Sequence, residues 1–138
     1  MTYMLVSERK AREPVRVRVP QDAYIALKRY HRNRKEHFFT ITLDGSHSII
    51  SIRIVSIGLV NRALVHPREV FYEAIRDNAT SVIIAHNHPS GHTDPSSEDR
   101  DVTRRLSEAG DILGIRILDH VIFSPKGYHS FLEHGELR

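Results

Sequence analysis

Hydrophobic positions along the chain follow two periods, which predicts strands and helices in alternation. Apolar residues at every second position, or short runs of β-branched residues, are typical of strands, whereas apolar residues every three or four positions are typical of helices. We expect strands at 14–19, 36–44, 49–57, 81–85, 115–123 and 128–132. Helices are expected at 21–33, at 67–78 and from 95 to about 110.

The order of these elements predicts an α/β fold, a mixed β-sheet with flanking helices. The strands at 36–44 and 49–57 form a hairpin because Asp44-Gly45 supplies the turn. Residues 59–66 continue the second strand irregularly or form a loop. The continuous apolar run at 81–85 indicates a central strand that is covered on both faces. We expect a single domain over 14–138, preceded at 1–13 by a polar, flexible arm or by a loosely tied edge.

Local signals set the expected helix boundaries. Pro67 suits the first position of a helix, and Asp94 with Pro95 predicts the N-cap and first residue of the next one, which Gly110 ends. The buried faces are expected to carry Val70, Phe71, Ala74 and Ile75 in the first of these helices and Val102, Leu106 and Ala109 in the second.

The composition narrows the chemistry. A chain of 138 residues can bury a core without disulfides, and the absence of cysteine means that a metal would need histidine and carboxylate ligands. No apolar run reaches the roughly 20 residues that a membrane span requires, so we expect a soluble, cytoplasmic protein with no membrane partner. The sequence leaves the oligomeric state open.

The chain is mildly basic, with a formal net charge of +3. Much of the excess lies in the first 35 residues, at Arg9, Lys10, Arg12, Arg16, Arg18, Lys28, Arg29, Arg32, Arg34 and Lys35. Such a cluster is ordinarily a solvated surface. Weak nucleic-acid contact through this N-terminal third is the alternative.

The stretch from Ser81 to Asp99 carries the clearest chemical pattern. His86 and His88 follow the apolar strand, and residues two apart on a strand leave from the same face, so both imidazoles can reach one point. A Pro/Gly loop then lets the chain turn back. A chance pair among ten histidines is the ordinary alternative.

Ser96 and Asp99 lie three residues apart at the start of the next helix, on the face that Val102 and Leu106 continue. Asp99 should therefore point toward the strand end. Two imidazoles and one carboxylate, with a fourth position open for water, are typical of a catalytic zinc site. A helix-capping pair is the competing interpretation of Ser96 and Asp99.

The spacing His86-x-His88, seven residues, Ser96, two residues, Asp99 resembles the JAMM motif of the MPN (JAB) metallohydrolase family, which includes zinc isopeptidases acting on ubiquitin-like conjugates. The chain is most similar to the bacterial RadC branch. That likeness rests on HPREVFYEAIRDNATSVIIAHNHPSG, PSSED, LDHVIF and GYHSFLEHG, and it covers roughly residues 14 to 134. It implies the MPN/JAB (cytidine-deaminase-like) architecture.

The resemblance also implies roles for individual residues. Zinc is held by His86, His88 and Asp99, and Ser96 helps to stabilise the oxyanion. A glutamate from an early strand acts as general base and then as acid, and Glu36 matches that position; Glu69 is the fallback. From the residues alone, Glu36 is an ordinary surface charge and Glu69 an ordinary first-turn carboxylate.

Two positions near the motif differ from its usual form. Asn87 stands where the eukaryotic-type motif has serine, in agreement with the RadC branch. His92 is either a solvent-facing loop residue or a cap on the open zinc position that would silence the site.

Two further expectations concern regions outside the motif. His66 is either structural or part of the cleft lining. The helix-hairpin-helix module of full RadC proteins is expected to be missing.

The leading expectation is thus a zinc-dependent hydrolase that cleaves a peptide or isopeptide bond in an unknown protein or peptide substrate. A nucleic-acid-binding accessory protein associated with DNA repair is the alternative from another class. A metal-dependent nuclease is a third possibility, because zinc-activated hydroxide also attacks phosphoryl centres.

Overall fold

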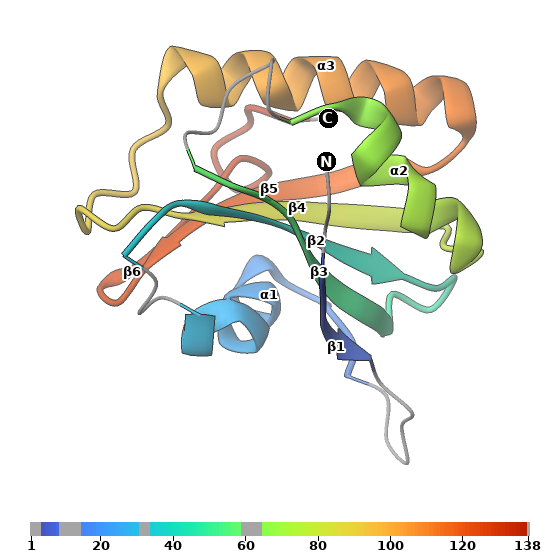
Figure 1. The fold of residues 1–138 in the computed structure, drawn as a ribbon, viewed down its shortest axis with the longest axis horizontal. Helices are drawn as coiled ribbons and strands as arrows, with labels where there is room; N and C mark the ends of the chain where they lie inside the picture. Colours follow the sequence, from blue (N-terminus) through green and yellow to red (C-terminus); the bar gives the residue numbers. More distant parts are fainter. Residues whose placement is uncertain (1–3, 9–14, 31–33, 59–64, 138) are drawn as a thin grey trace.

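A six-stranded sheet with helices on both faces forms the molecule (Figure 1). The computed structural model describes residues 4–8, 15–30, 34–58 and 65–137. The strands are β1 (Met4–Glu8), β2 (His37–Leu43), β3 (Ile49–Ile57), β4 (Ser81–Asn87), β5 (Arg116–Ser124) and β6 (Gly127–Ser130). The helices are α1 (Pro20–Leu27), the short 3-10 helix η1 (Lys28–Tyr30), α2 (Pro67–Arg76) and α3 (Ser97–Leu113). The expected α/β fold is confirmed.

The strand order is β1-β3-β2-β4-β5-β6. β2 and β3 form the expected antiparallel hairpin, and β2 also pairs antiparallel with β4. β4 and β5 are parallel and are joined by α3, which makes the sheet mixed. β4 thus lies between two neighbours, and residues 81–85 are buried, as their continuous apolar sequence predicted; the last two residues of β4 are buried as well.

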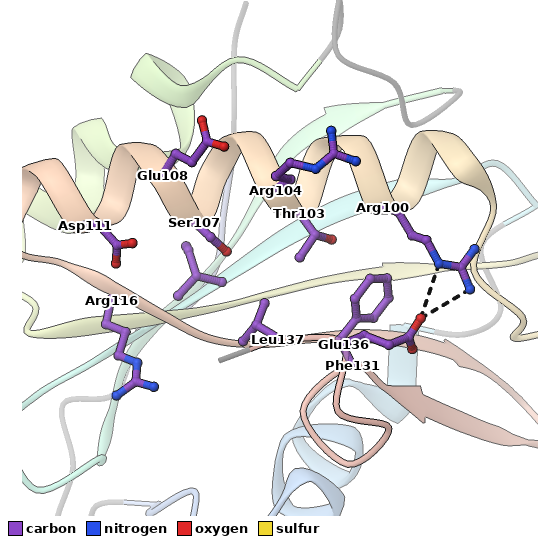
Figure 2. Close-up of a pocket in the computed structure, with 11 residues that line it drawn as sticks. Arg100, Thr103, Arg104, Ser107, Glu108, Asp111, Arg116, Phe131, Glu136 and Leu137 are labelled. Atoms are coloured by element: carbon purple, nitrogen blue, oxygen red, sulfur yellow. Dashed lines mark hydrogen bonds and ion pairs between the residues drawn. The ribbon is translucent and has the colours of Figure 1, made fainter.

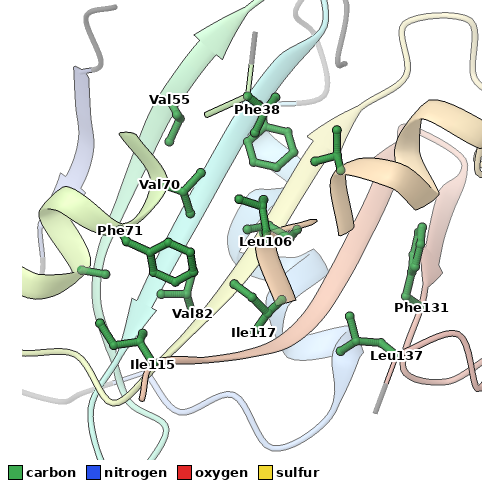
Figure 3. Close-up of a cluster of buried hydrophobic side chains, with 14 of the residues drawn as sticks. Phe38, Val55, Val70, Phe71, Val82, Leu106, Ile115, Ile117, Phe131 and Leu137 are labelled. Atoms are coloured by element: carbon green, nitrogen blue, oxygen red, sulfur yellow. The ribbon is translucent and has the colours of Figure 1, made fainter. Parts of the chain in front are cut away.

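Two apolar clusters cover the two faces of the sheet, with α2 and α3 on one face and α1 on the other (Figure 1). Val82 and Ile84 of β4 pack in the first cluster, whereas Ile83 and Ala85 pack in the second. Figure 3 shows Val82 in the first cluster beside Phe71 and Leu106. His86 continues the alternation of Val82 and Ile84, so its side chain leaves toward α3.

The prediction of a strand at 14–19 is wrong. Only Val17 of its three valines is buried, and the segment contributes a single isolated bridge, between Arg16 and Ser48. The segment turns into α1 instead, because the Asp22 carboxylate accepts hydrogen bonds from the backbone N–H groups of Arg18 and Val19, at 2.8 and 3.2 Å. The edge strand is β1, within the residues expected to form an arm, and it pairs with β3.

The helix expected at 21–33 begins at Pro20, changes to the 3-10 helix at Lys28 and is described to Tyr30. Residues 31–33, and most of the 59–66 segment for which the sequence left two alternatives, lie outside the described residues. His66 is described, and it forms the N-cap of α2 by accepting the N–H of Arg68 on Nδ1, at 3.3 Å. This contact supports the structural interpretation of His66.

α2 begins at Pro67 as expected and buries Val70, Phe71 and Ala74. The expectation for Ile75 is wrong, because this side chain is 57% exposed. Four residues span slightly more than one helical turn, so Ile75 lies further around the helix than Phe71. That position is past the edge of the buried face.

Both expected ends of α3 are wrong. The N-cap is Ser96 rather than Asp94, since Ser96 and Asp99 satisfy two backbone N–H groups reciprocally, which an Asp94 cap does not offer. The helix continues through Gly110 to Leu113 and ends at Gly114, whose φ of 72° is left-handed. Gly110 is instead a point of close approach, because a Cβ there would clash with the carbonyl oxygen of Ile115.

Within the described ranges, none of the helices combines the length and apolar character that a bilayer crossing needs.

Candidate metal centre

The end of β4 and the start of α3 bring three of the predicted site residues together. His86 is completely buried, and the side chain of His88 is 15% exposed. Nε2 of His86 lies 2.9 Å from Nε2 of His88 and 3.2 Å from Oδ1 of Asp99. Nε2 of His88 lies 3.7 Å from Oδ2 of Asp99. This group, which we call the β4–α3 cluster, has the composition that the sequence predicted for a metal site.

Asp99 is held by a capping box at the N-terminus of α3. Its backbone N–H donates to Oγ of Ser96, at 3.1 Å, and its Oδ2 accepts the backbone N–H of Ser96, at 2.8 Å. The competing interpretation of this pair as a helix cap is therefore confirmed. The two interpretations are compatible, because the cap leaves Oδ1 facing His86. Ser96 itself is exposed beside the cluster.

The Asp99 carboxylate is ionised at neutral pH although it is only 2% exposed. Burial alone would raise its pKa, but the hydrogen bond from the Ser96 backbone N–H helps to hold the pKa below its ordinary value. A buried carboxylate that stays charged needs a cationic partner nearby.

His88 presents an unprotonated nitrogen to the cluster. Its Nδ1 lies 2.7 Å from the carbonyl oxygen of His92, which can only accept, so the proton of the neutral ring is on Nδ1. His92 thus contributes its backbone to the site, and its side chain is exposed. The cluster formed by the described residues does not include the His92 ring, which fits the interpretation of His92 as a solvent-facing loop residue.

A buried hydrogen-bond chain determines the tautomer of His86. Thr103 Oγ1 donates to the carbonyl oxygen of Asp99, at 2.8 Å, so it must accept the proton on Nδ1 of His120, 2.5 Å away. Nε2 of His120 then accepts from Nδ1 of His86, at 2.9 Å. Burial lowers the pKa of His120 well below its ordinary value, so this ring is neutral. His86 therefore also turns an unprotonated Nε2 toward His88 and Asp99.

These contacts test whether the residues fit a metal ion. Two unprotonated nitrogens and a carboxylate that lie this close repel one another, and a cation between them removes the repulsion. Two imidazoles and one carboxylate suit zinc, which takes nitrogen and oxygen ligands and leaves a fourth position open in catalytic sites. Each histidine also donates its other N–H to a partner, as metal-binding histidines commonly do. The site fits a zinc ion.

Replacing Thr103 with valine is expected to weaken zinc binding by about 10- to 100-fold, the usual effect of removing a group that orients a metal ligand. Without the hydroxyl, His120 loses the acceptor that determines its tautomer, and His86 is free to protonate Nε2. Competition with a chromophoric chelator measures the affinity. Thr103→Ser keeps the hydroxyl and should bind zinc like the wild type, whereas equal affinity in Thr103→Val would contradict the proposed chain.

Glu36 lies immediately before β2, and its side chain is half-buried. Phe38 pairs with His86 across β2 and β4, so one further two-residue step of this antiparallel register places Glu36 opposite His88. The Glu36 carbonyl accepts the N–H of Gly58, at 2.8 Å. The paired region itself ends at Phe38 and His86, and its continuation would bring the Glu36 backbone to the His88 end of the cluster.

Asn87 holds the backbone on both sides of Glu36. Its Oδ1 accepts the N–H of His37, at 2.7 Å, and its Nδ2 donates to the carbonyl oxygen of Lys35, at 3.0 Å. The amide between the two histidines therefore ties the Glu36 segment to the end of β4. A serine hydroxyl at this position is too short to span both groups with the same geometry.

Sequence reasoning missed His120, Thr103 and the contacts of Asn87. His120 lies in the LDHVIF segment, and an apolar strand with one histidine carries no signal of its own. Glu69, the fallback base, lies in the first turn of α2, where its Oε1 is 3.9 Å from Nε of Arg68.

Comparison with known proteins places the sequence of this chain in a family. Residues 17–136 match the model of the RadC-like JAB domain. A UPF0758 protein of Trichlorobacter lovleyi is 54% identical over 105 residues, which are 76% of this chain and 46% of that protein. A UPF0758 protein of Desulfitobacterium hafniense is 49% identical over 119 residues, 86% of this chain and 52% of that protein.

The chain spans about half the length of the curated relatives it matches, and their names state no activity. The family match covers nearly all of the described fold, including the strand and the helix that carry the β4–α3 cluster. The chain therefore belongs to the RadC-like JAB domain family.

Proposed function

We propose that this chain is a zinc-dependent hydrolase of JAMM type that cleaves a peptide or isopeptide bond. The observation that carries the proposal is the convergence of Nε2 of His86, Nε2 of His88 and the Asp99 carboxylate where β4 ends and α3 begins. The JAB family to which the chain belongs includes metallohydrolases, and this supports the reaction class. A cytoplasmic location and a protein or peptide substrate are part of the same proposal.

His86, His88 and Asp99 would hold the metal. When bound, zinc supplies a Lewis acid and lowers the pKa of water to about 7. The Ser96 backbone N–H keeps Asp99 oriented, and the Thr103–His120 chain keeps His86 in the tautomer that binds. The chain's own residues thus contribute a preset ligand geometry.

Glu36 would move the proton. As general base, its carboxylate takes a proton from the attacking water, and as general acid it returns the proton to the leaving amine. Asn87 fixes the backbone from which Glu36 reaches the site. The Ser96 hydroxyl, which accepts the Asp99 N–H, still has its own proton to donate to the oxyanion of the substrate.

A nucleic-acid-associated role in DNA repair, with or without nuclease activity, is the second candidate. It is favoured by the exposure of Arg16, Arg18, Lys28, Arg29, Arg34 and Lys35 in the N-terminal third. Exposed cations bind phosphates in a salt-dependent way and without sequence preference. This role requires no change to the metal site.

One substrate panel separates the two candidates. Wild-type protein is loaded with zinc or stripped with a chelator and is then offered peptide, isopeptide-linked and oligonucleotide substrates. We expect cleavage of an amide substrate that disappears on stripping and returns with zinc. Oligonucleotide anisotropy at low and high salt tests the second candidate. Amide substrates left intact, together with salt-steep oligonucleotide binding or cleavage, would overturn the first candidate in favour of the second.

A further inference from the structure

A second group of metal-binding side chains lies at the C-terminal end of the fold. It consists of His129 on β6, of His134 in the turn that follows and of Glu136 just after that turn, and we call it the C-terminal cluster. One ligand atom from each residue lies within 4.8 Å of the others. It shares no residue with the β4–α3 cluster.

The two histidine rings of the cluster are stacked, with centroids 4.0 Å apart and planes 18° from parallel. Nδ1 of His134 lies 2.9 Å from the carbonyl oxygen of Ser130, so it carries the ring proton and leaves Nε2 with a lone pair. A backbone carbonyl on the second nitrogen is a common partner of metal-binding histidines.

Glu136 is oriented by α3. Its Oε2 accepts from Nε and Nη2 of Arg100, both at 3.2 Å (Figure 2). Its Oε1 accepts from Nε2 of His129, at 2.7 Å. Arg100 thus contacts one carboxylate oxygen of Glu136, and the other oxygen faces His129. Metal-binding carboxylates are typically held by such a second partner.

The backbone of the cluster is held in place by other contacts. The buried Asp119 carboxylate accepts from the Ser130 hydroxyl, at 2.5 Å, and from the Leu132 N–H, at 2.9 Å. The Glu136 N–H donates to the Phe131 carbonyl oxygen, at 2.8 Å, and Gly135 supplies the left-handed φ of 69° that this turn needs. A cation would therefore meet donors already close to their bound positions.

We propose that His129, His134 and Glu136 bind a second divalent cation of the zinc class. Two imidazole nitrogens and one carboxylate oxygen suit this class of ion. In the metal-free protein the Nε2 proton of His129 lies between His129 and Glu136, and on binding the cation replaces this proton, which leaves to solvent. The ion would connect β6 and the C-terminal turns to α3 through Glu136 and Arg100.

The groove beside α3 extends from this cluster. It encloses about 640 Å³ and is lined at one end by Arg100, Phe131 and Glu136 and at the other by Asp111 and Arg116 (Figure 2). None of its lining residues is a predicted ligand of the β4–α3 cluster. The second cation would therefore form part of a different surface from the first.

The experiment is a zinc titration by equilibrium dialysis with elemental analysis, on the full chain. We expect two zinc ions per chain in the wild type, one in His88→Ala, one in His134→Gln, and none in the double variant. His47→Asn is the matched control, because His47 is exposed, outside both clusters and has a φ of 62° that asparagine accepts. It should keep both ions.

The proposal is overturned if His134→Gln binds as much zinc as the wild type, or if His88→Ala binds none while folded. Glu136→Gln provides a second variant should His134→Gln fail to fold, which thermal unfolding reports. A single ion that survives in His88→Ala but not in His134→Gln would support the C-terminal site even if the β4–α3 cluster proved unable to bind zinc, so the two proposals fail separately.

Discussion

Zinc binding at the β4–α3 cluster is expected to fall by more than about 100-fold when Asp99 is replaced by asparagine, since even changes that only disturb a ligand's orientation cost 10- to 100-fold. Asparagine keeps the shape of the side chain and an oxygen for the Ser96 N–H, but it removes the charge that faces His86. Hydrolysis of any amide substrate should disappear with the metal. Chelator competition and elemental analysis measure the loss.

Asp101→Asn is the matched control for this result. Asp101 lies on the same helix, two residues further along, and its carboxylate contacts Arg104 at 3.1 Å instead of the cluster. The control should therefore bind zinc like the wild type. Equal zinc affinity in Asp99→Asn and Asp101→Asn, with both proteins folded, would exclude Asp99 as a ligand.

Glu36→Gln is expected to keep its zinc and to hydrolyse substrate about 10²- to 10⁴-fold more slowly, the range that a general base contributes. Glutamine preserves the size of the side chain and the backbone contacts of this segment with Asn87 and Gly58, but it cannot take a proton. The turnover number of zinc-loaded protein on the substrate found in the panel measures the effect, with zinc content determined on the same samples.

Glu69→Gln separates the two candidate bases. Glu69 lies in the first turn of α2, and its replacement should leave turnover within about twofold, as is usual for an exposed or partly exposed charge that takes no part in the reaction. Full activity in Glu36→Gln together with a large loss in Glu69→Gln would reverse the assignment. A loss of zinc in Glu36→Gln would instead indicate that Glu36 binds the metal.

The local part of the metal centre was predictable from short-range rules. The two-residue period of a strand places His86 and His88 on one face, and the continuous apolar run before them identified a central strand. The helical period placed Asp99 on the face of Val102 and Leu106, both of which are buried. These inferences needed only neighbours within a few residues, where backbone geometry determines direction.

Element boundaries were less predictable, because tertiary contacts compete with local signals. The alternating valines at 15, 17 and 19 have the pattern of a strand, yet Asp22 turns the segment into α1 and β1 takes the sheet edge. Gly110 looked like a helix stop, but it allows α3 to approach the backbone of Ile115 and the ring of Phe71. In each case a contact distant in sequence outweighs the local preference.

The sequence by itself determined which residues could bind a metal, because the histidine pair and the direction of Asp99 follow from strand and helix periods. Only the tertiary structure decided which other residues contact and orient these side chains. His120 reaches His86 because β5 is the parallel neighbour of β4, and Asn87 reaches the Glu36 segment because β2 is its antiparallel neighbour. Strand order and register arise from packing of the whole chain, which no short stretch of sequence encodes.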